Sequence, residues 1–504
     1  MPQRNETTDV IITGAGPVGL FLANELALQG IAVTVLERLT EQSQAIKAGG
    51  INGRTTQILT RRGLGDTLAR VAAESADGFA AFAAGRTLPA NPSLSRPRFD
   101  GHFAGIFLHA GPELPVPPST VLPQQALETL LAARATDLGV KIHRGYELID
   151  VETHPDAVRA LATSNHGSLS VTGRYLVGCD GGRSTVRKLA QIAFPGTDPI
   201  TTGYQAVADL ENPEALPFGW FATDVGLYAH GPKAGRLLTV SFDGPPADRN
   251  APVTLTELQD NIRHVSGHDV TITAVHSSTR YTDNIRQAST YREGRILLAG
   301  DAAHIHPPYG GQGLNTGLQD ANNLGWKIAA VLRGDAEDHL LDTYTTERHP
   351  VGAQVLLNTR AQVALLRPDP RDRAMRELFR SLLDTVPKLA DNLVSRLQGL
   401  DIRYDMGADN PHTMIGAFMP DTPGLSDAMR SGNWLLVSPD PDAVDPASAL
   451  RARFGLSTLR APLPDGATAC LVRPDGFVAW ATGATGTKAT EVETALAQWL
   501  TTTA

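Results

Sequence analysis

The sequence predicts an α/β protein built around a parallel β-sheet, with an antiparallel sheet inserted into it and a small α/β domain after it. Three observations support this fold class. Apolar segments at residues 9–13 and 32–36 flank a helical stretch, which is the pattern of a βαβ unit. A second strand, turn and helix begin at residue 295. Between residues 203 and 282 the pattern changes to short alternating segments separated by Pro and Gly, which favours antiparallel strands.

Elements of the first half of the chain alternate between strands and helices. The βαβ unit has its strands at residues 9–13 and 32–36 and its helix at residues 20–28. A longer helical pattern and several short strands follow. They are expected at residues 127–138 for the helix and at residues 140–143, 147–151 and 175–178 for the strands.

The second half begins with the inserted antiparallel region and returns to the parallel pattern. A strand at residues 295–299 leads through a loop at 300–313 into a helix at 316–331, and helical patterns continue from 341 to 397. Residues 401–433 are rich in Gly, Pro and Asp, which predicts a linker. The last elements are expected at residues 434–437 and 469–472 for strands and at 495–500 for a helix.

Composition and charge limit the classes of protein to which this chain can belong. The 504 residues include 44 Lys and Arg against 53 Asp and Glu, a formal net charge of −9, which argues against nucleic acid as the main partner. The length allows about two to four domains. No window approaches the ~18 consecutive apolar residues of a membrane helix, so no membrane partner is expected. The N-terminal residues lack the apolar core of a signal peptide, which predicts a cytoplasmic protein.

Cysteine usage excludes several kinds of site. The two cysteines, Cys179 and Cys470, cannot form a disulfide framework, a four-cysteine zinc site or a C-x-x-C redox pair. We expect Cys179 to be a small buried residue rather than a nucleophile, because no histidine of the neighbouring motif could activate it.

Gly14, Gly16 and Gly19 form a G-x-G-x-x-G motif between the first strand and the first helix. In this context the first glycine allows a tight turn, the second lets the backbone approach a pyrophosphate, and the third lets helix and strand pack. Glu37 ends the second strand about 18 residues after Gly19, where a carboxylate accepts hydrogen bonds from the adenosine ribose. The motif predicts a Rossmann-like dinucleotide site, with a ligand-free glycine turn as the alternative, and does not distinguish NAD from FAD.

A second motif favours a flavin. The sequence from Gly300 to His304 (GDAAH) follows an apolar strand and precedes a glycine-rich stretch at residues 307–315. An aspartate can accept hydrogen bonds from ribityl hydroxyls, and glycine-rich backbone can lie against the flavin ring and donate amide hydrogens to its carbonyls. The alternative is a metal held by Asp301, His304 and His306, but the loop offers no further acid and its glycines suit a planar ligand better. We therefore expect FAD and no metal.

Three stretches carry a family resemblance: Gly14–Gly19, Cys179–Arg187 (CDGGRSTVR), and residues 300–326 (GDAAHIHPPYGGQGLNTGLQDANNLGW). Together they resemble the fingerprints of the single-component FAD-dependent aromatic hydroxylases. This family includes para-hydroxybenzoate and phenol hydroxylases and the polyketide hydroxylases of antibiotic pathways. The C-terminal stretch Leu471–Trp480 resembles the thioredoxin-like tail of the larger members, although it lacks C-x-x-C and so cannot do redox work.

The resemblance implies a role for each matching residue. Asp301 would hold the ribityl chain, and the amides of Leu314 and Asn315 would face the flavin pyrimidine carbonyls. The residues expected at the reacting centre, where the loop borders the flavin ring, are Pro308, Gly310 and Gly311. The residues expected to bind the cofactor are Gly14, Gly16, Pro17, Val18, Gly19, Glu37, Arg38, Arg54, Gln124, Asp180, Gly300, Asp301, Pro308, Gly311, Gly313, Leu314 and Asn315.

Two arginines and a tyrosine add to this implied site. Arg183 and Arg187 would lie with Asp180 near the pyrophosphate or the nicotinamide nucleotide, and a solvated helix start is the alternative explanation for both arginines. Tyr309 stands where family members often have a smaller residue, which indicates a reshaped pocket. NAD(P)H is expected to bind transiently, because the chain has no second G-x-G-x-x-G motif.

The resemblance also implies a domain division. A discontinuous, Rossmann-like FAD-binding domain would comprise residues 1–202 and 283–400, and the antiparallel substrate domain would comprise residues 203–282 with part of 75–105. A linker at 401–432 would lead to a thioredoxin-like domain at 433–504. Aromatic residues of the substrate domain are candidates for the pocket wall, although core packing explains each of them equally well. They are Tyr204, Phe218, Trp220, Phe221, Tyr228 and Phe242.

The function predicted from these features is that of an FAD- and NAD(P)H-dependent monooxygenase. By resemblance it would use O2 to form a flavin 4a-hydroperoxide in a site that excludes water, and would hydroxylate a polycyclic aromatic, polyketide-type phenol in secondary metabolism. Baeyer-Villiger oxygen insertion on a similar substrate is one alternative. A flavin-containing drug- or pigment-binding protein without turnover is another. The chain is expected to be a monomer or a homodimer.

Overall fold

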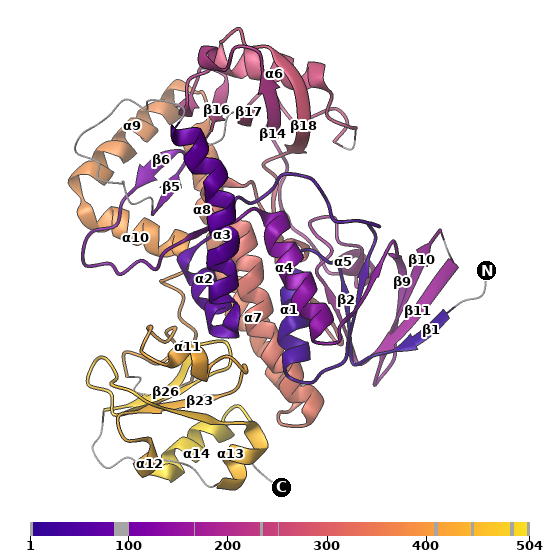
Figure 1. Ribbon diagram of the computed structural model, residues 1–504, viewed down its shortest axis with the longest axis vertical. Helices are drawn as coiled ribbons and strands as arrows, with labels where there is room; N and C mark the ends of the chain where they lie inside the picture. The colour runs from indigo at the N-terminus through magenta and orange to yellow at the C-terminus, as the bar shows by residue number, and fades with distance from the viewer. Residues whose placement is uncertain are drawn as a thin grey trace.

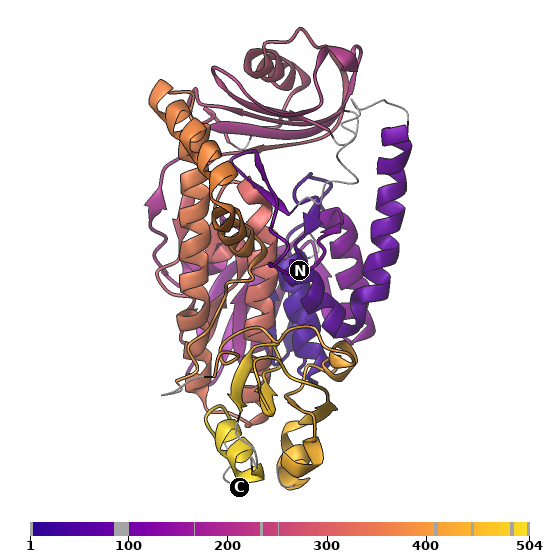
Figure 2. The same ribbon diagram turned by 90° about the vertical axis from the view of Figure 1, so that its left-hand side faces the viewer.

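The computed structural model describes residues 4–84, 100–165, 167–231, 235–249, 251–407, 412–444, 448–483 and 488–500. Residues 85–99 of the segment assigned to the substrate domain lie outside this part of the chain. Figure 1 shows a central α/β body with the antiparallel sheet at one end and residues 401–500, here called the C-terminal unit, at the other. The side view in Figure 2 shows the same order along the long axis.

A six-stranded sheet in the order β20-β21-β12-β2-β3-β8 forms the centre of this body. All its neighbouring strands are parallel except the pair β20 and β21. The apolar residues of β2, Val10, Ile11 and Ile12, are fully buried, as expected for a parallel sheet that is covered on both faces. The strands are β2 (Val10–Thr13), β3 (Val33–Glu37), β8 (Lys141–Arg144), β12 (Tyr175–Gly178), β20 (Arg292–Glu293) and β21 (Ile296–Leu298).

Helices cover one face of the central sheet and a second sheet covers the other (Figure 1). Helix α1 (Pro17–Leu28) packs between α7 (Gln312–Arg333) and α4 (Gln124–Asp137). The covering sheet has the order β1-β11-β10-β9. Its strands are β1 (Arg4–Thr7), β9 (Glu147–Thr153), β10 (Val158–Ser164) and β11 (Gly167–Gly173).

The inserted sheet is antiparallel between all neighbouring strands, as predicted, and has the order β15-β16-β17-β14-β18. Helix α6 (Leu255–Ser266) packs on one of its faces and starts with a capping box made by Thr254 and Glu257. The strands are β14 (Thr202–Leu210), β15 (Gly219–Ala222), β16 (Gly226–His230), β17 (Arg236–Ser241) and β18 (Ile272–Tyr281).

Side-chain alternation sorts the aromatic residues of this sheet between its two faces. The group that packs between the sheet and α6 is Tyr204, Phe221 and Tyr228. The group on the opposite face, which clusters with Tyr309 of the glycine-rich loop, includes Trp220, Phe242 and Tyr281. Core packing against α6 therefore accounts for the first group, and the second group faces the part of the molecule that carries the loop.

Three helices extend the helical layer beyond α7. They are α8 (Asp342–Leu366), α9 (Pro370–Thr385) and α10 (Pro387–Gln398). Pro370 and Pro387 occupy first helical positions, where the missing N–H is not needed, and so divide the helical pattern predicted for 341–397. A 20-residue helix, α3 (Gly65–Ala84), lies earlier in the chain. The shorter elements are β4 (Gly50–Ile51), α2 (Gly53–Leu59), η1 (Thr60–Leu64), β5 (Gly101–Phe103), β6 (Ile106–Leu108), β7 (Thr120–Val121), α5 (Thr185–Leu189), β13 (Gly196–Thr197), β19 (Ile285–Gln287) and β22 (His304–Ile305).

The C-terminal unit contains a mixed four-stranded sheet in the order β24-β23-β25-β26. Only the pair β23 and β24 is parallel among the described strands of this sheet. The elements are β23 (Leu435–Ser438), α12 (Pro441–Val444), α13 (Ser448–Phe454), β24 (Ser457–Arg460), β25 (Ala469–Val472), β26 (Val478–Thr482) and α14 (Ala489–Ala497).

Described residues of the segment 401–432, which was predicted to be a linker, pack against this sheet. They contribute α11 (Leu425–Ala428) and four side chains that are buried with the sheet residues. These four are Met414, Met419, Leu425 and Met429. The few apolar positions are spread through a segment rich in Gly, Pro and Asp, so the local composition does not reveal that the segment packs.

A buried network of ion pairs joins the C-terminal unit to α7 and α8. Arg473 donates to both carboxylate oxygens of Glu347, at 2.7 and 2.9 Å, and to Asp475. Lys327 donates to Glu347 at 2.9 Å. Burial lowers the pKa of Lys327 to about 8, against the opposing effect of Glu347. Burial alone would raise the pKa of Glu347, but Arg473 and Lys327 hold it well below its usual range.

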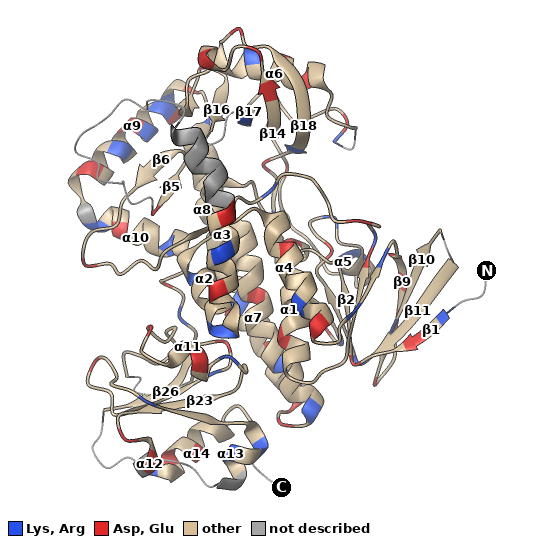
Figure 3. Ribbon diagram, in the orientation of Figure 1, with Lys and Arg blue, Asp and Glu red and all other residues tan. Residues whose placement is uncertain are grey.

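Charged residues of both signs are distributed over all parts of the fold (Figure 3). The formal net charge of the chain is −9. Within the described ranges, no helix is both long and apolar enough to cross a membrane.

Candidate active site

The glycine turn after β2 has two glycines that are required by the protein itself. Gly14 has a φ of +100°, and a Cβ atom there would lie 2.4 Å from the carbonyl oxygen of Cys179. A Cβ atom at Gly19 would lie 2.1 Å from the carbonyl oxygen of Gly14. Gly16, the N-cap of α1, differs from both, because its φ is −77° and no protein atom lies within 4 Å of its Cβ position. The space beside Gly16 therefore fits an external group, and the helix N-terminus favours an anion there.

Replacing Gly16 with alanine should separate cofactor binding from folding. Its φ suits any residue and the added methyl group meets no protein atom, so the thermal midpoint of the apoprotein should move by less than about 2 °C. The methyl group would stand where a pyrophosphate approaches the backbone, so the Kd for FAD should rise at least about tenfold. Fluorescence titration with FAD and thermal unfolding measure the two effects. An unchanged Kd would show that the pyrophosphate does not lie beside Gly16.

Glu37 supports the glycine turn from the end of β3. Its Oε2 accepts the amide hydrogen of Ala15 at 2.8 Å and its Oε1 accepts that of Leu39 at 2.8 Å. A carboxylate has further lone pairs on each oxygen, so Glu37 can also accept from a ribose hydroxyl. The neighbouring Arg38 is exposed. The acidic side chain is therefore oriented by the same turn that would hold the pyrophosphate.

The loop after β21 contacts the glycine turn at Val18. Gly300 has a φ of +61°, and a Cβ atom there would lie 3.0 Å from a Val18 methyl carbon. A Cβ atom at Gly317 would lie 2.6 Å from the same carbon. Asp301 is exposed beside this junction, so its carboxylate is available to a ligand. The structure thus brings the first and third sequence motifs together.

The glycine-rich stretch ends at the N-terminus of the 22-residue helix α7. Gly310 and Gly311 have φ values of +76° and +63°, and no protein atom lies within 4 Å of the Cβ position of Gly311, the N-cap. Asn315 fixes this end of the helix, because its Nδ2 donates to the Gly311 carbonyl at 2.8 Å and its Oδ1 accepts from the Asn52 amide at 2.9 Å. Pro308 is exposed beside them. The result is an open, glycine-lined surface at a helix N-terminus, which suits a planar group with carbonyl oxygens.

Asp320, a buried residue of α7, anchors this loop by hydrogen bonds. Its Oδ2 accepts from the Gly300 amide at 3.1 Å and from Nε2 of His304 at 2.7 Å, and its Oδ1 accepts from Nε of Arg348 at 2.7 Å. The side chains of His304, Asp320 and Arg348 are fully buried. Burial alone would raise the pKa of Asp320, but Arg348 and His304 hold it below its usual value. A charged carboxylate therefore anchors both the strand end and the loop.

Asp180 and Arg187 belong to the second sequence motif. Oδ2 of Asp180 accepts hydrogen bonds from the amides of Thr185 and Val186 at 2.7 and 3.1 Å, whereas its buried Oδ1 has no hydrogen-bond partner among the described residues. Burial raises the pKa of this carboxyl. Arg187 is also buried, and it donates to the Ala302 carbonyl at 2.7 Å, so it ties the second motif to the third rather than facing solvent. Arg183 is exposed.

Arg54 and Gln124 make contacts within the protein. The Arg54 guanidinium lies 3.9 Å from the ring centroid of Phe418 in the C-terminal unit and donates to Gln57 at 2.9 Å. Burial lowers the pKa of Arg54 to about 9. The Gln124 side chain donates to Glu128 at 2.8 Å. The cofactor-binding roles expected for Arg54 and Gln124 remain predictions.

The histidines that could have bound a metal have other partners. His304 bonds to Asp320, and Nδ1 of His306 lies 2.7 Å from the Pro307 carbonyl oxygen. Burial lowers the pKa of His306. In the part of the chain that the structure describes, no three potential metal-binding side chains come together.

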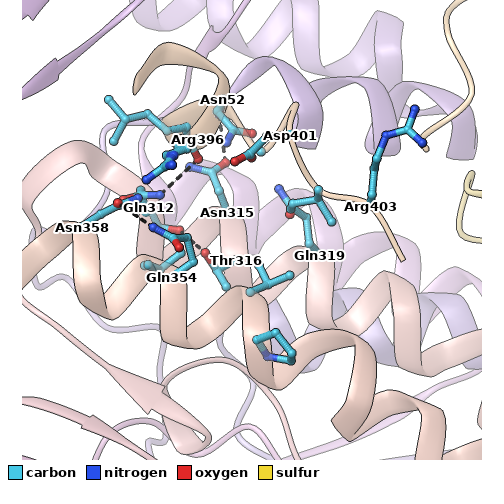
Figure 4. Close-up of a pocket in the computed structure, with 16 residues that line it drawn as sticks. Asn52, Gln312, Asn315, Thr316, Gln319, Gln354, Asn358, Arg396, Asp401 and Arg403 are labelled. Carbon is cyan, nitrogen blue, oxygen red and sulfur yellow. Dashed lines mark hydrogen bonds between the residues drawn. The ribbon is translucent and has the colours of Figure 1, made fainter. Parts of the chain in front are cut away.

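A polar cavity of about 200 Å³ lies beside Asn315, between α7, α8 and residues 396–403 (Figure 4). Side-chain amides of six residues line part of it, and Figure 4 shows Gln312 close to the hydrogen-bonded pair Gln354 and Asn358. Organic ligands of drug size fill cavities of about 300–1,000 Å³. This cavity is therefore too small for a polycyclic substrate, and we do not assign the substrate to it. The amides that line it are those of Asn52, Gln312, Asn315, Gln319, Gln354 and Asn358.

Comparison with protein families identifies the family of this chain. The family described as "FAD binding domain" matches residues 7–359, and the family described as "Aromatic-ring hydroxylase, C-terminal" matches residues 406–503. The chain belongs to the FAD-dependent aromatic-ring hydroxylases. The predicted family, the enzyme class of flavin-dependent monooxygenase and the FAD cofactor are thereby confirmed, and NAD(P)H is the usual co-substrate of this family.

Relatives of this hydroxylase cover its whole length. It is 39% identical to the 12-dehydrotetracycline 5-monooxygenase/anhydrotetracycline 6-monooxygenase of Streptomyces rimosus, over 97% of this chain and 98% of the relative. The solved structure of the OxyS anhydrotetracycline hydroxylase from Streptomyces rimosus superposes with a TM-score of 0.82 at 37% identity, covering 99% of this chain and all of that one. A dialkyldecalin synthase of Streptomyces rugosporus is 36% identical over 97% of this chain and 98% of its own length.

Several residues that lie beneath the site were not predicted from the sequence. Asp320 lies within the third motif, about two turns into α7, so its position in a buried polar helix face was a usable signal. Asn52 lies two residues before the predicted Arg54 and has no motif of its own. Arg348 has no local signal, because only the packing of α8 on α7 brings it to Asp320.

Proposed function

We propose that this hydroxylase oxygenates a polycyclic, polyketide-type phenol, with NAD(P)H as reductant and O2 as oxidant. The observation that carries the proposal is the open surface at Gly311 and the N-terminus of α7, which faces the side of the molecule where the inserted sheet presents Trp220 and Phe242. The similarity over the full length to an enzyme named for anhydrotetracycline supports the choice of substrate class. Bound FAD supplies the activation of O2.

The protein's own residues would bind, orient and exclude water. We propose that the backbone amides at Gly313, Leu314 and Asn315 donate to the flavin carbonyls. Those of Gly313 and Leu314 belong to the first turn of α7, whose amides have no partner within the helix. Pro308 and the two glycines would border the ring. The other predicted cofactor residues would contact FAD according to their positions. Residues 14–19 and 37–38 would bind its adenosine diphosphate part, and Asp180 and Asp301 would lie near the middle of the cofactor.

The apolar cluster under the inserted sheet would form the wall that excludes water. It combines residues of the sheet, the β5-β6 hairpin and helices α8 and α10. Transfer of the apolar surface of an aromatic substrate from water into such surroundings is favourable. A site without water also protects the oxygen-transfer step from side reactions. Tyr309, which is buried in this cluster, narrows it next to the loop.

We also propose the finer fold assignments. A Rossmann-like FAD-binding domain at residues 1–202 and 283–400 is supported by the parallel sheet and its glycine turn. A thioredoxin-like C-terminal domain is supported by the mixed sheet flanked by α12, α13 and α14. The packing of Met414 and Met419 favours including the segment before residue 433 in that domain.

Replacing Asp301 with alanine should weaken FAD binding about tenfold, or by about 1–2 kcal/mol, because it removes an acceptor for ribityl hydroxyls. Asp156, an exposed aspartate between β9 and β10, gives the matched control, and its replacement with alanine should leave the Kd unchanged. Both values come from fluorescence titration of the apoprotein. Equal affinities of the two variants would remove Asp301 from the cofactor site.

The function itself is tested by turnover with a panel of polycyclic phenols that includes anhydrotetracycline. We expect NADH or NADPH oxidation to accelerate when a substrate is present and the product to gain one oxygen atom. A ring-expanded lactone or ester product would favour Baeyer-Villiger insertion. Binding of these compounds without accelerated NAD(P)H oxidation would contradict the proposed substrate class.

A further inference from the structure

The C-terminal unit contacts the two consecutive residues of α8 that support the loop next to the proposed cofactor site. Arg348 is shared between three partners: Nε donates to Asp320 at 2.7 Å, one terminal nitrogen donates to the Thr316 carbonyl at 3.1 Å, and the other donates to the Tyr404 hydroxyl at 3.0 Å. Glu347, the preceding residue, binds Arg473.

These contacts form a continuous path from the C-terminal unit to the loop. The Tyr404 ring packs against that of Phe477 in the C-terminal unit, with ring centroids 4.2 Å apart and planes tilted by 36°, so its hydroxyl is held in place. Arg348 then holds Asp320, and Asp320 holds the Gly300 amide and His304. Each side chain along the path is at least nine-tenths buried. A buried guanidinium with three fixed acceptors has one orientation, and it transmits that orientation to the carboxylate that it pairs with.

The loop has short-range hydrogen bonds of its own, such as those from the Ala303 amide to the Gly300 carbonyl at 2.8 Å and from the Gly311 amide to the Pro308 carbonyl at 3.2 Å. Gly300 and the two glycines at 310 and 311 have positive φ values and no side chains, so contacts from outside the loop add to its order. Asp320 supplies two of the hydrogen bonds that do so. A loop that must border a ligand closely gains affinity when it is ordered before the ligand arrives.

We propose that the C-terminal unit is a positioning element for the cofactor loop, acting through Tyr404 and Arg348 on Asp320 and thereby on Gly300 and His304. The inference rests on the proposed place of FAD beside Asp301. It assigns Tyr404, Arg348 and Asp320 as positioning residues, since each acts on the cofactor through another residue. It also gives the unit a role that needs no redox cysteine.

Tyr404→Phe tests this path with one atom removed. The variant keeps the ring contact with Phe477 but loses the hydrogen bond that Arg348 donates to the hydroxyl. Tyr175→Phe is the control, because the Tyr175 hydroxyl donates to Asp338 at 2.6 Å, also a charged group, and neither Tyr175 nor Asp338 belongs to this path. For both variants we measure the thermal midpoint, the Kd for FAD and hydrogen exchange of the apoprotein in the peptide that spans residues 298–306.

For Tyr404→Phe we expect faster exchange in this peptide and a Kd for FAD raised about threefold to tenfold, with a thermal midpoint close to that of Tyr175→Phe. Arg348→Lys, which keeps the charge but cannot reach three partners, should show a larger loss of affinity and covers the case in which the first variant folds poorly. Unchanged exchange and affinity in Tyr404→Phe, or an equal loss in Tyr175→Phe, would overturn the proposal. Hydrogen exchange and the Kd for FAD are both measured without turnover, so neither result depends on the proposed substrate class.

Discussion

Replacing Arg473 with methionine is expected to destabilise the folded chain by about 3–5 kcal/mol, the largest effect on stability that the structure predicts. Methionine fills similar space but leaves Glu347 with Lys327 and the amide of Asn323 as its partners, and leaves Asp475 without an ion-pair partner among the described side chains. A buried carboxylate without its partner retains the cost of leaving water. The shift in the urea midpoint, with m unchanged, measures the loss.

The control for this variant is an ion pair of the same unit at its surface. Arg460 pairs with Asp442, and both side chains are more than half exposed. Arg460→Met should therefore change the free energy of unfolding by no more than about 1 kcal/mol. If the two variants are equally stable, the buried network is not what joins the C-terminal unit to α7 and α8.

Replacing Gly311 with valine is expected to uncouple the reaction rather than to abolish folding. Valine would place a branched side chain in the open space where the loop is proposed to border the flavin ring. The displaced ring and substrate should lower the amount of product per NAD(P)H by about tenfold to a hundredfold, with hydrogen peroxide formed in its place. Product, peroxide and NAD(P)H are measured together in the same reaction.

Gly334 supplies a control at the other end of the same helix. It is the C-cap of α7, has a φ of +76° and also has no protein atom within 4 Å of its Cβ position. Gly334→Val and Gly311→Val should thus carry similar backbone strain, about 1–2 kcal/mol. Only Gly311→Val should lose coupling. A fully coupled Gly311→Val enzyme would show that this loop does not border the oxygenating flavin.

Local patterns in the sequence were sufficient to predict most of the fold. The apolar runs at Val10–Thr13 and Ile296–Leu298 predict buried parallel strands, because such strands are covered on both faces and need no polar alternation. Alternation in residues 203–282 predicts the antiparallel sheet but not which of its faces meets the loop. That choice depends on where α6 packs, which is a tertiary fact.

The supporting side chains of the site were harder to predict, because their partners are distant in the sequence. Arg187 reads locally as a solvated helix residue, yet it is buried by its bond to Ala302. Arg348 and Glu347 occupy ordinary helical positions, and only the packing of α8 against α7 and the C-terminal unit makes them buried charges. The glycines of the site could be predicted, since a tight turn or a close approach restricts the residue type at its own position.

The most direct test of the central claim is a single-turnover experiment with isotopically labelled oxygen. The FAD-loaded enzyme is reduced anaerobically with NADPH or NADH in the presence of anhydrotetracycline, labelled O2 is admitted, and the product is analysed by mass spectrometry. We expect one labelled oxygen atom in the organic product and reoxidised FAD. Reoxidation that yields only labelled hydrogen peroxide with every phenol of the panel would contradict the assignment of this chain as an oxygenase of polycyclic phenols.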